Sequence, residues 1–443
     1  MRILHLSTHD TLGGAGRAAT RLHRALKSLP DIEASQMFVA EKSGADPDTL
    51  AITHPIHDSL RRYAERLPLK LTSFPDLVHQ SLAWLPNLNL TKSIRHFKPD
   101  LIHLHWVQNA FLPIQSIPRL ASPQTPIVWT FHDMWPVCGM FHHEYSDAQR
   151  YPHPYEKTSR PKCQGGLDLD AWTWHRKAKA YRRLEQQKRP VSGVTPSQWL
   201  ADQAEQSALW KMRALAVIPN GIDTTIFKPA EKKAVRHLLN LPQDKLVITF
   251  GAMFAGSDPN KGYRELVSAL KEIRFNSSDL HLAIFGMDKP SKDAEPDFSY
   301  ATTYFGTLKD EVSLAALYSA SDIVVAPSRQ ESFGLVAAEA MACAKPIVAF
   351  GASATKEVVQ HQETGYLAEP FSPVSLARGI EWTLEDPDRL ARLGTQARRH
   401  VINRFALENI AQQYRSLYQQ LLAQTPSLPA RPRQTQPHAP QSP

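Results

Sequence analysis

The chain has 443 residues, 42% of them hydrophobic and 21% charged, as is typical of a globular protein long enough for two domains. Its formal net charge of +8 favours an anionic ligand or surface, and we expect no nucleic-acid partner. The chain shows neither a signal peptide nor the roughly 20 apolar residues of a membrane span, and three cysteines provide no disulfide framework, so we expect a cytoplasmic protein.

The first half of the chain alternates strand and helix patterns. Residues 2–8 are an apolar strand candidate, a glycine-rich turn follows at 13–16, and apolar residues recur at helical spacing over 17–29. Further strands are predicted at 33–40, 99–106, 126–132 and 191–195, and further helices at 56–71, 170–189 and after Ser197. The segment 133–169 is long, irregular and rich in His, Pro and aromatic residues, which favours a binding loop.

Residues 214–223 are predicted to form a strand and then a turn, which a Pro and an Asn-Gly pair mark. A second α/β series follows, and we place the domain boundary between 212 and 213. Its strands are predicted at 246–250, 280–285, 303–305, 323–326 and 347–350, and its helices at 261–274, 309–319, 334–343, 373–384 and 387–403. A last helix, 405–423, is expected to pack back toward the N-terminal domain, and the Pro-rich residues 424–443 to be a disordered tail.

The predicted fold is therefore α/β, with two Rossmann-like, doubly wound domains at 1–212 and 213–404. Ligands of open parallel sheets bind beyond the carboxyl ends of the strands. The glycine turn and the segment around 331–339 both follow strands, so they are expected to face each other across one cleft.

The glycine turn is a candidate phosphate site. Glycine exposes backbone N–H groups, and the helix that follows offers its positive end. Gly14-Ala-Gly16-Arg-Ala-Ala19 also fits the dinucleotide spacing G-x-G-x-x-[GA], which keeps a nicotinamide oxidoreductase as an alternative. Five residues, Thr8 to Leu12, separate strand and glycines, however, whereas a dinucleotide turn is tight.

Two glutamates bracket the most regular strand–turn–helix unit of the chain. Glu331 falls in the turn and Glu339 in an Ala-rich helix, where a carboxylate is costly to bury without a ligand or a partner. Both can accept hydrogen bonds from sugar hydroxyls. By spacing alone, two exposed charges are the better interpretation.

The run Glu331-Ser-Phe-Gly-Leu-Val-Ala-Ala-Glu-Ala-Met-Ala nonetheless resembles the E-x7-E signature of glycosyltransferase family 4, retaining enzymes of the GT-B fold. Gly13-Gly-Ala-Gly16, Thr130-Phe-His132, Val194-Thr-Pro-Ser197, Ile218-Pro-Asn-Gly-Ile-Asp223 and Lys261-Gly262 occur in the family's order. Within the family, the segments 103–106 and 129–136 look most like those of transferases that build bacterial exopolysaccharide or cell-surface polysaccharide.

The resemblance implies three catalytic residues. Glu331 would contact the hydroxyls of the donor sugar. Lys261 would neutralise the phosphate charge that grows as the sugar–phosphate bond breaks. His132, at a strand end, would lie near the reacting carbon.

The resemblance also implies a donor site. Glu339 would hold the nucleoside ribose, and the backbone of Gly334 and Leu335 would bind the diphosphate. Gly14 and Gly16 would close on the diphosphate from the other domain. The further donor-binding candidates are Phe333 and Arg329.

One feature departs from the family. Its members usually have an arginine just after the strand that precedes Lys261, where this chain has Ala252-Met253. Phosphate stabilisation would then depend on Lys261, with Arg264 or Arg329 as the nearest substitutes. A catalytically weak or inactive nucleotide-sugar-binding module is therefore the alternative to an active enzyme.

We expect no metal and no cofactor. Asp168-Leu-Asp170 resembles the metal-binding D-x-D of another glycosyltransferase fold, but it directly precedes a helix, which favours an N-cap role. A group of histidines and cysteines also lacks zinc spacing; its members are His132, Cys138, His142, His143, His153 and Cys163.

Basic residues crowd the helix at 170–189 and the segment 61–70. They suit a lipid-phosphate acceptor or an anionic membrane surface as well as they suit a solvated face. Those in the helix are Arg176, Lys177, Lys179, Arg182, Arg183, Lys188 and Arg189.

The predicted function is retaining, metal-independent transfer of a sugar from a nucleotide-sugar to an acceptor hydroxyl of a saccharide or lipid-linked saccharide, in the cytoplasm or on the inner face of the cell membrane.

Overall fold

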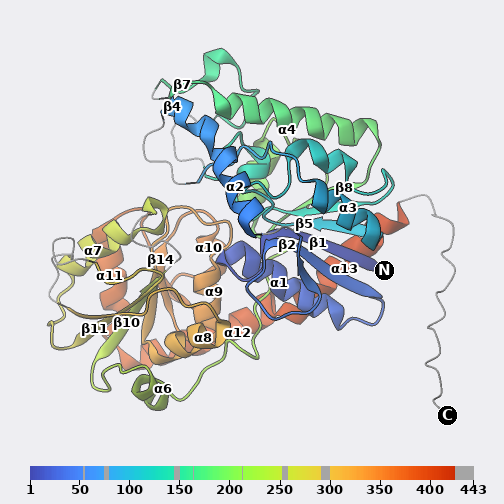
Figure 1. Ribbon diagram of the computed structural model, residues 1–443. Coiled ribbons are helices and arrows are strands. Elements are labelled where there is room, and N and C mark those ends of the chain that lie inside the picture. The colour runs from blue at the N-terminus through green and yellow to red at the C-terminus, as the bar shows by residue number, and fades with distance from the viewer. Residues whose placement is uncertain are drawn as a thin grey trace, which may run out of the picture.

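The structure is a computed structural model that describes residues 1–52, 55–73, 79–143, 150–162, 164–211, 213–251, 258–290 and 300–424. Two parallel sheets, each flanked by helices, make up the body of the molecule (Figure 1). The first has the strand order β3-β2-β1-β5-β6-β8-β9 and the second β12-β11-β10-β13-β14-β15. A short antiparallel pair, β4 with β7, lies apart from both.

The first sheet is built from β1 (Arg2–His9), β2 (Ala34–Glu41), β3 (Thr49–Ala51), β5 (Leu101–Leu104), β6 (Ile127–Thr130), β8 (Val191–Thr195) and β9 (Leu215–Val217). Its helices include α1 (Gly13–Lys27), α2 (Pro55–Arg66), α3 (Leu88–Phe97), α4 (Leu169–Gln186) and α5 (Gln198–Gln206), with the 3-10 turn η1 (Leu67–Leu71) after α2. The pair β4 (Thr72–Ser73) and β7 (Gly165–Gly166) joins the end of η1 to the start of α4.

The second sheet is built from β10 (Leu246–Gly251), β11 (Leu280–Phe285), β12 (Ala301–Tyr304), β13 (Ile323–Ala326), β14 (Ile347–Phe350) and β15 (Gly365–Ala368). Its helices are α6 (Lys232–Leu238), α7 (Tyr263–Glu272), α8 (Glu311–Ala320), α9 (Leu335–Ala342), α10 (Thr355–Val358), α11 (Pro373–Leu384) and α12 (Pro387–Phe405), with the short turn η5 (Pro259–Lys261) before α7.

Both faces of the second sheet are buried, which explains its near-continuous apolar strands. Alternate residues of a strand point to opposite faces. Ile323 and Val325 of β13 belong to the core shared with α7 and α11, and Val324 between them belongs to the core shared with α8, α9 and α12. This alternation is what a doubly wound sheet requires.

The chain crosses between the two sheets twice, and the crossings lie side by side. The N–H of Ile222 donates to the carbonyl of Phe405 at 2.8 Å, and the N–H of Leu407 donates to the carbonyl of Ile222 at 3.0 Å. After the second crossing, α13 (Leu407–Ala423) packs against α1 and the first sheet (Figure 1), where Tyr414 and Tyr418 are buried.

Several details differ from the sequence-based expectations. Helix α1 begins at Gly13, inside the glycine run, and not at Arg17. Strand β9 is the last strand of the first sheet, so the predicted boundary at 212/213 falls before that strand. The Pro and the Asn-Gly pair, which mark the passage to the second domain, come after β9. Elements β3, α3, α6 and β15 were not predicted. The predicted tail lies outside the described residues beyond 424, and within them no helix is long and apolar enough to cross a bilayer.

Candidate active site

The centre of the candidate site is an ion pair between two loops of the second domain. Nζ of Lys261, at the end of η5, lies 2.9 Å from Oε1 of Glu331. Asn260 and Gln330, one residue before each, hold the loops together: the Asn260 side-chain amide donates to the Gln330 carbonyl, and the Gln330 N–H donates to Oδ1 of Asn260, both at 2.8 Å. Side-chain exposures of 21% and 24% leave Lys261 and Glu331 open to a ligand.

Both partners of this pair are charged at neutral pH. Burial alone would lower the pKa of Lys261, but the carboxylate of Glu331 outweighs it and raises that pKa. Burial alone would raise the pKa of Glu331, but the ammonium of Lys261 outweighs it and lowers that pKa. The site therefore offers a fixed cation beside a fixed hydrogen-bond acceptor.

Glycine supplies the backbone that places Lys261. Gly262 has a φ of +69°, and a Cβ at this position would lie 1.9 Å from the carbonyl oxygen of Pro327. Only glycine fits such a close approach in the left-handed region. The position of Lys261 therefore depends on a glycine at 262.

Two helix N-termini face each other across the domains. Helix α9 begins after Gly334, whose φ is +99°, and α1 begins at Gly13. A Cβ on Gly14 would lie 3.1 Å from Cδ1 of Leu335, so the glycine run directly abuts the start of α9. Neither helix has a capping side chain or an acidic residue in its first turn. Their first N–H groups and positive ends suit an anion.

Close approach also constrains Gly16. A Cβ there would lie 3.0 Å from the carbonyl oxygens of His9 and Asp10 at the end of β1. Gly16 therefore lets α1 pack tightly against the strand that precedes it. Gly16 thus lies on the face of α1 that meets β1, whereas Gly14 lies on the face that meets the second domain.

Glu339 is buried and paired with the opposite domain. Its Oε1 accepts a hydrogen bond from Nη2 of Arg21 on α1 at 2.6 Å, and its Oε2 accepts a longer one, 3.3 Å, from Tyr318. Nε of Arg21 also pairs with Glu311 at 2.6 Å. With 2% exposure, Glu339 offers no open surface in this arrangement, and Arg21 occupies the carboxylate that the resemblance assigns to a ribose.

Arg21 was not among the predicted site residues. The available signal was its position one helical turn after Arg17, on the helix that follows the glycine run. Arg17 likewise reaches the second domain, where its Nη2 donates to the carbonyl of Leu308 at 2.8 Å. Like charges at i, i+4 of a helix repel each other, so this pair is stabilised by the acceptors that it meets in the second domain.

His132 lies at the carboxyl end of β6, where the domains touch. The hydroxyl of Ser332 donates to the His132 carbonyl at 2.7 Å, and the hydroxyl of Ser197 donates to the Ser332 carbonyl at 2.7 Å. Burial lowers the pKa of His132 to about 4, so its ring is neutral. These bonds place His132 next to the loop that carries Glu331.

A second polar group near this point was missed by sequence reasoning. Oδ2 of Asp133 accepts hydrogen bonds from Nδ1 of His142 at 2.6 Å and from the indole of Trp106 at 2.9 Å, and Nε2 of His142 bonds Ser81 at 2.9 Å. Asp133 and His142 are nine residues apart, and His142 was weighed above as a zinc ligand. Trp106 and Ser81 come from distant segments, so spacing alone does not connect them with Asp133.

Two donor-site candidates point elsewhere. The Phe333 side chain is 2% exposed and packs edge-on against Phe405 in the core, so only its backbone can meet a ligand. The Arg329 guanidinium pairs with Glu265 at 2.6 Å and lies over the ring of Phe371. The segment 252–257, where the family has its arginine, lies outside the described residues.

The Asp168–Asp170 pair serves the fold. Oδ1 of Asp168 accepts from the N–H of Ala171 at 2.9 Å, which confirms the predicted N-cap of α4. Asp170 accepts from the N–H of Met140 at 2.8 Å, and Arg150 pairs with both carboxylates. Of the residues weighed as zinc ligands, Cys163 lies outside the described residues. Within the described residues, the one group of potential metal ligands is His5, His103 and His105, and it includes none of the other five.

The basic face expected on α4 is smaller than its sequence indicates. Lys177 is fully buried and donates to the carbonyls of Trp135, Cys138 and Gly139, while burial lowers its pKa to about 7. Arg189 is also buried, and its Nε donates to a carbonyl at 2.7 Å. Both hold loops in place, so neither contributes to a surface for an anionic partner.

Comparisons with known proteins identify the family. Residues 12–226 match the family Glycosyltransferase Family 4, and residues 233–400 match Glycosyl transferases group 1. A D-inositol 3-phosphate glycosyltransferase from Thermobispora bispora is 32% identical over 218 residues, which cover 47% of this chain and 51% of that protein. The match thus spans about half the length of this curated relative.

Solved structures share the fold over nearly the whole chain. Sucrose-phosphate synthase from Thermosynechococcus elongatus has a TM-score of 0.67 and 23% identity, with 96% of this chain and 100% of that chain covered. HepE from Anabaena, in complex with UDP-glucose, has a TM-score of 0.64 and 18% identity, with 95% and 100% covered.

The two parallel α/β sheets and the solved structures that share them place the chain in the GT-B class of folds. The chain belongs to glycosyltransferase family 4.

Proposed function

We propose that this chain is a retaining, metal-independent glycosyltransferase that moves a sugar from a nucleotide-sugar to an acceptor hydroxyl. The observation that carries the proposal is the Lys261–Glu331 pair beside two uncapped helix starts, α9 and α1, which abut across the domains. A cation and two sets of free N–H groups suit a diphosphate, and a partly exposed carboxylate suits sugar hydroxyls.

Catalysis would rest on stabilising the leaving phosphate. The bond between the anomeric carbon and the phosphate oxygen breaks, and the new bond forms to the acceptor oxygen on the same face of the sugar. The acceptor proton passes to the departing phosphate. Lys261 offsets the negative charge that grows on that oxygen, and closed domains keep out the water that would hydrolyse the donor.

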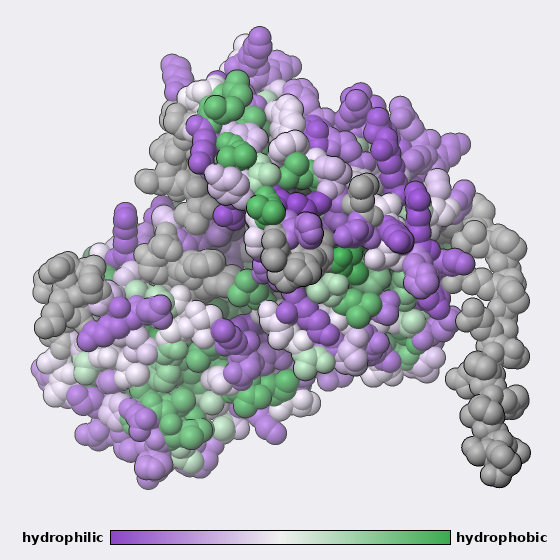
Figure 2. Space-filling view, in the orientation of Figure 1, coloured by the Kyte–Doolittle hydropathy of each residue, from purple (hydrophilic) through white to green (hydrophobic). Residues whose placement is uncertain are grey.

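The acceptor is proposed to be a saccharide or lipid-linked saccharide of a bacterial exopolysaccharide or cell-surface polysaccharide. An exposed apolar stripe near β4, β7 and α2 supports contact with an anionic membrane. Figure 2 shows hydrophobic side chains on this part of the surface, interspersed with hydrophilic ones. The stripe consists of Leu60, Tyr63, Leu67, Leu71, Leu167 and Trp172, whose exposures range from 39% to 63%.

The stripe has the pattern of a helix that lies on a membrane. Residues 60, 63 and 67 fall on one helical face, and the N–H of Leu167 donates to the carbonyl of Leu71 at 3.1 Å, which joins the two parts of the stripe. Basic side chains flank it: Lys70 lies near the Tyr63 ring, and Arg176 lies over Trp172. Apolar insertion and attraction to anionic lipid add together in such a surface.

Vesicle sedimentation tests the membrane contact. Full-length protein should bind vesicles that contain anionic lipid, and Leu60→Ser with Leu71→Ser should reduce the bound fraction several-fold. Val312→Ser is the matched control, since Val312 is equally exposed at 69% but lies on α8 of the other domain. Equal binding by all three proteins would contradict the contact.

The enzymatic proposal is tested by incubation with a panel of nucleotide-sugars, UDP-glucose among them. A bound donor raises the melting temperature by mass action, and turnover releases free nucleotide. Release that depends on Lys261 and Glu331 is the expected result. Binding without release under any acceptor condition would instead support an inactive nucleotide-sugar-binding module, which the engagement of Arg329 by Glu265 favours.

A further inference from the structure

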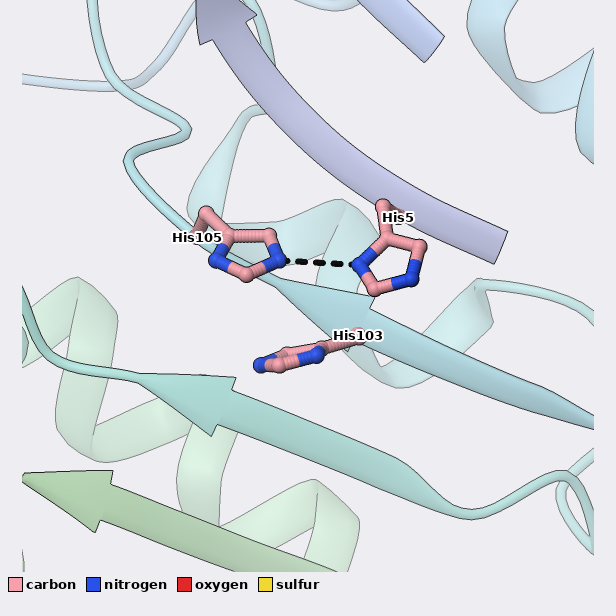
Figure 3. A group of neighbouring side chains, drawn as sticks. All are labelled: His5, His103 and His105. Atoms are coloured by element: carbon pink, nitrogen blue, oxygen red, sulfur yellow. Dashed lines mark hydrogen bonds between the residues drawn. The ribbon is translucent and has the colours of Figure 1, made fainter. Parts of the chain in front are cut away.

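Three buried histidines lie together inside the first sheet (Figure 3): His5 on β1, His103 on β5 and His105 just after β5. Such a group resembles a metal site, but hydrogen bonds already use both ring nitrogens of His103. Its Nδ1 lies 2.6 Å from the Tyr418 hydroxyl, and its Nε2 lies 2.8 Å from Oγ1 of Thr130. The His103 and His105 ring centroids are only 4.0 Å apart, so these rings pack on each other.

Hydrogen bonds connect two of these residues to the candidate active site. Nδ1 of His5 lies 3.0 Å from Nε2 of His105 (Figure 3), and Nδ1 of His105 lies 3.3 Å from Nε2 of His132. We call His5, His105 and His132 the histidine chain. Exposure is 0% at His5 and 2% at His105, whereas His132 is only partly buried. The histidine chain thus runs from the interior of the first sheet to the contact between the domains.

A neutral imidazole has one N–H and one lone pair, so each member of such a chain constrains the next. Burial lowers the pKa of all three rings well below 6.5, which keeps them neutral. Nε2 of His5 is buried and has no hydrogen-bond partner within the described residues. An orphaned N–H is the group that protein interiors avoid most. The proton of His5 therefore belongs on Nδ1, where His105 accepts it.

We propose that His5 and His105 are positioning residues that fix His132 in the tautomer with its proton on Nδ1. His105 accepts on Nε2, so it carries its own proton on Nδ1 and donates it to Nε2 of His132. The hydrogen bond of the His132 ring to the described part of the chain is made by Nε2, and its Nδ1 then remains as a free N–H.

The consequence for chemistry rests on the proposed function. A sugar hydroxyl or phosphate oxygen that reaches His132 meets a hydrogen-bond donor and not a base. The tautomer assigns His132 a role in holding the donor, and leaves the acceptor proton to the departing phosphate.

The test is the tautomer itself, measured in the full chain without nucleotide. Spectra that correlate ring carbon-bound protons with both nitrogens of labelled histidine separate protonated from bare nitrogens. The His132 signals are those lost in His132→Asn. We expect a protonated Nδ1 and a bare Nε2 at pH 7. A protonated Nε2 would overturn the proposal, whatever the variants show.

Two matched variants test the cause. His105→Leu removes the donor to His132, and the population of the Nε2–H tautomer should rise at least several-fold. His103→Gln alters an equally buried ring of the same group that lies outside the histidine chain, and it should leave the His132 spectrum unchanged. An unchanged His132 in His105→Leu, or the same change in both variants, would contradict a positioning role.

These spectra also separate this inference from the proposed function. They require neither donor nor turnover, so a chain with no transferase activity can still show the expected tautomer. In an active enzyme, His105→Leu should lower kcat about 10-fold with little change in KM, because orientation is lost and the diphosphate contacts remain.

Discussion

Replacement of Arg21 by leucine is the sharpest test of how the two domains meet. Arg21 is 3% exposed and neutralises Glu339, which is equally buried. Among the described residues, the Glu339 carboxylate has one further hydrogen bond, a long one from Tyr318. Arg21→Leu therefore leaves a buried carboxylate without a charged partner. Glu311 loses the same partner, but at 19% side-chain exposure it can be solvated by water.

The magnitude follows from this asymmetry. Removal of one partner of a buried pair costs about 3–5 kcal/mol. Glu339→Leu should cost less, roughly 2 kcal/mol, because Arg21 keeps Glu311. The double variant should recover part of the loss, since two apolar side chains at the contact leave no buried charge. The coupling between the two sites should then exceed about 2 kcal/mol, the loss expected for Glu339→Leu alone.

Urea and thermal unfolding of the four proteins measure this cycle. Arg24→Leu is the matched control: it removes another arginine of α1, 48% exposed and 3.5 Å from Asp46, and should change stability by less than about 1 kcal/mol. If the Arg21 and Glu339 effects add within about 0.5 kcal/mol, the pair does not join the domains in solution, and the reasoning fails.

Two further predictions concern the site and a third concerns a buried lysine outside it. Lys261→Ala and Glu331→Ala should each reduce sugar transfer by at least about 100-fold, measured as nucleotide release, with Lys233→Ala, an exposed lysine of α6, as the unaffected control. Gly14→Val should weaken donor binding in a thermal-shift titration while circular dichroism stays unchanged, since its side chain would meet the start of α9; unaltered affinity would contradict the contact. The pKa of Lys177 is lowered from 10.5 to about 7, so the unfolded chain binds the extra proton between these values and stability should rise with pH over that window, by an amount of the order of 5 kcal/mol. Lys177→Met should flatten the rise in melting temperature with pH, and the same slope in both proteins would show that Lys177 does not titrate there.

Much of the fold follows from local patterns. Apolar runs such as 280–285 became strands with the expected bounds, and Ser197 caps α5 with its hydroxyl accepting from the N–H of Leu200 at 3.2 Å. The edge strands β3 and β15 were missed because they are short and half exposed, so they lack the apolar run of a central strand.

Helical periodicity and charge counting give different positions for Lys177 of α4. Lys177 lies three residues after Trp174 and four before Tyr181, which places it on the buried face of α4. Charge counting treated it as surface, whereas periodicity assigns it to the core. Its carbonyl partners lie about 40 residues earlier in the chain, so spacing alone does not identify them.

Long-range pairs limit what the sequence tells about the site. Arg21 and Glu339 are 318 residues apart, and no local rule pairs them. The Ala-rich surroundings of Glu339 did predict a need for a partner or a ligand. The structure supplies a partner from the other domain, whereas the family resemblance implies a ligand.

If Glu339 has both partners in turn, Arg21 and the ribose, then donor binding is linked to the Arg21–Glu339 contact between the domains. Glu331 pairs with Lys261 inside one domain, so that pair persists however the domains move. Glu339 pairs with Arg21 across the domains, so that pair forms only when α1 and α9 are close. Under the proposed function, a ribose needs the carboxylate that Arg21 holds. Loss of the Arg21–Glu339 pair therefore frees Glu339 for the ribose, and a bound ribose weakens this one pair by the same free energy, while the glycine run of α1 and the start of α9 stay close around the diphosphate.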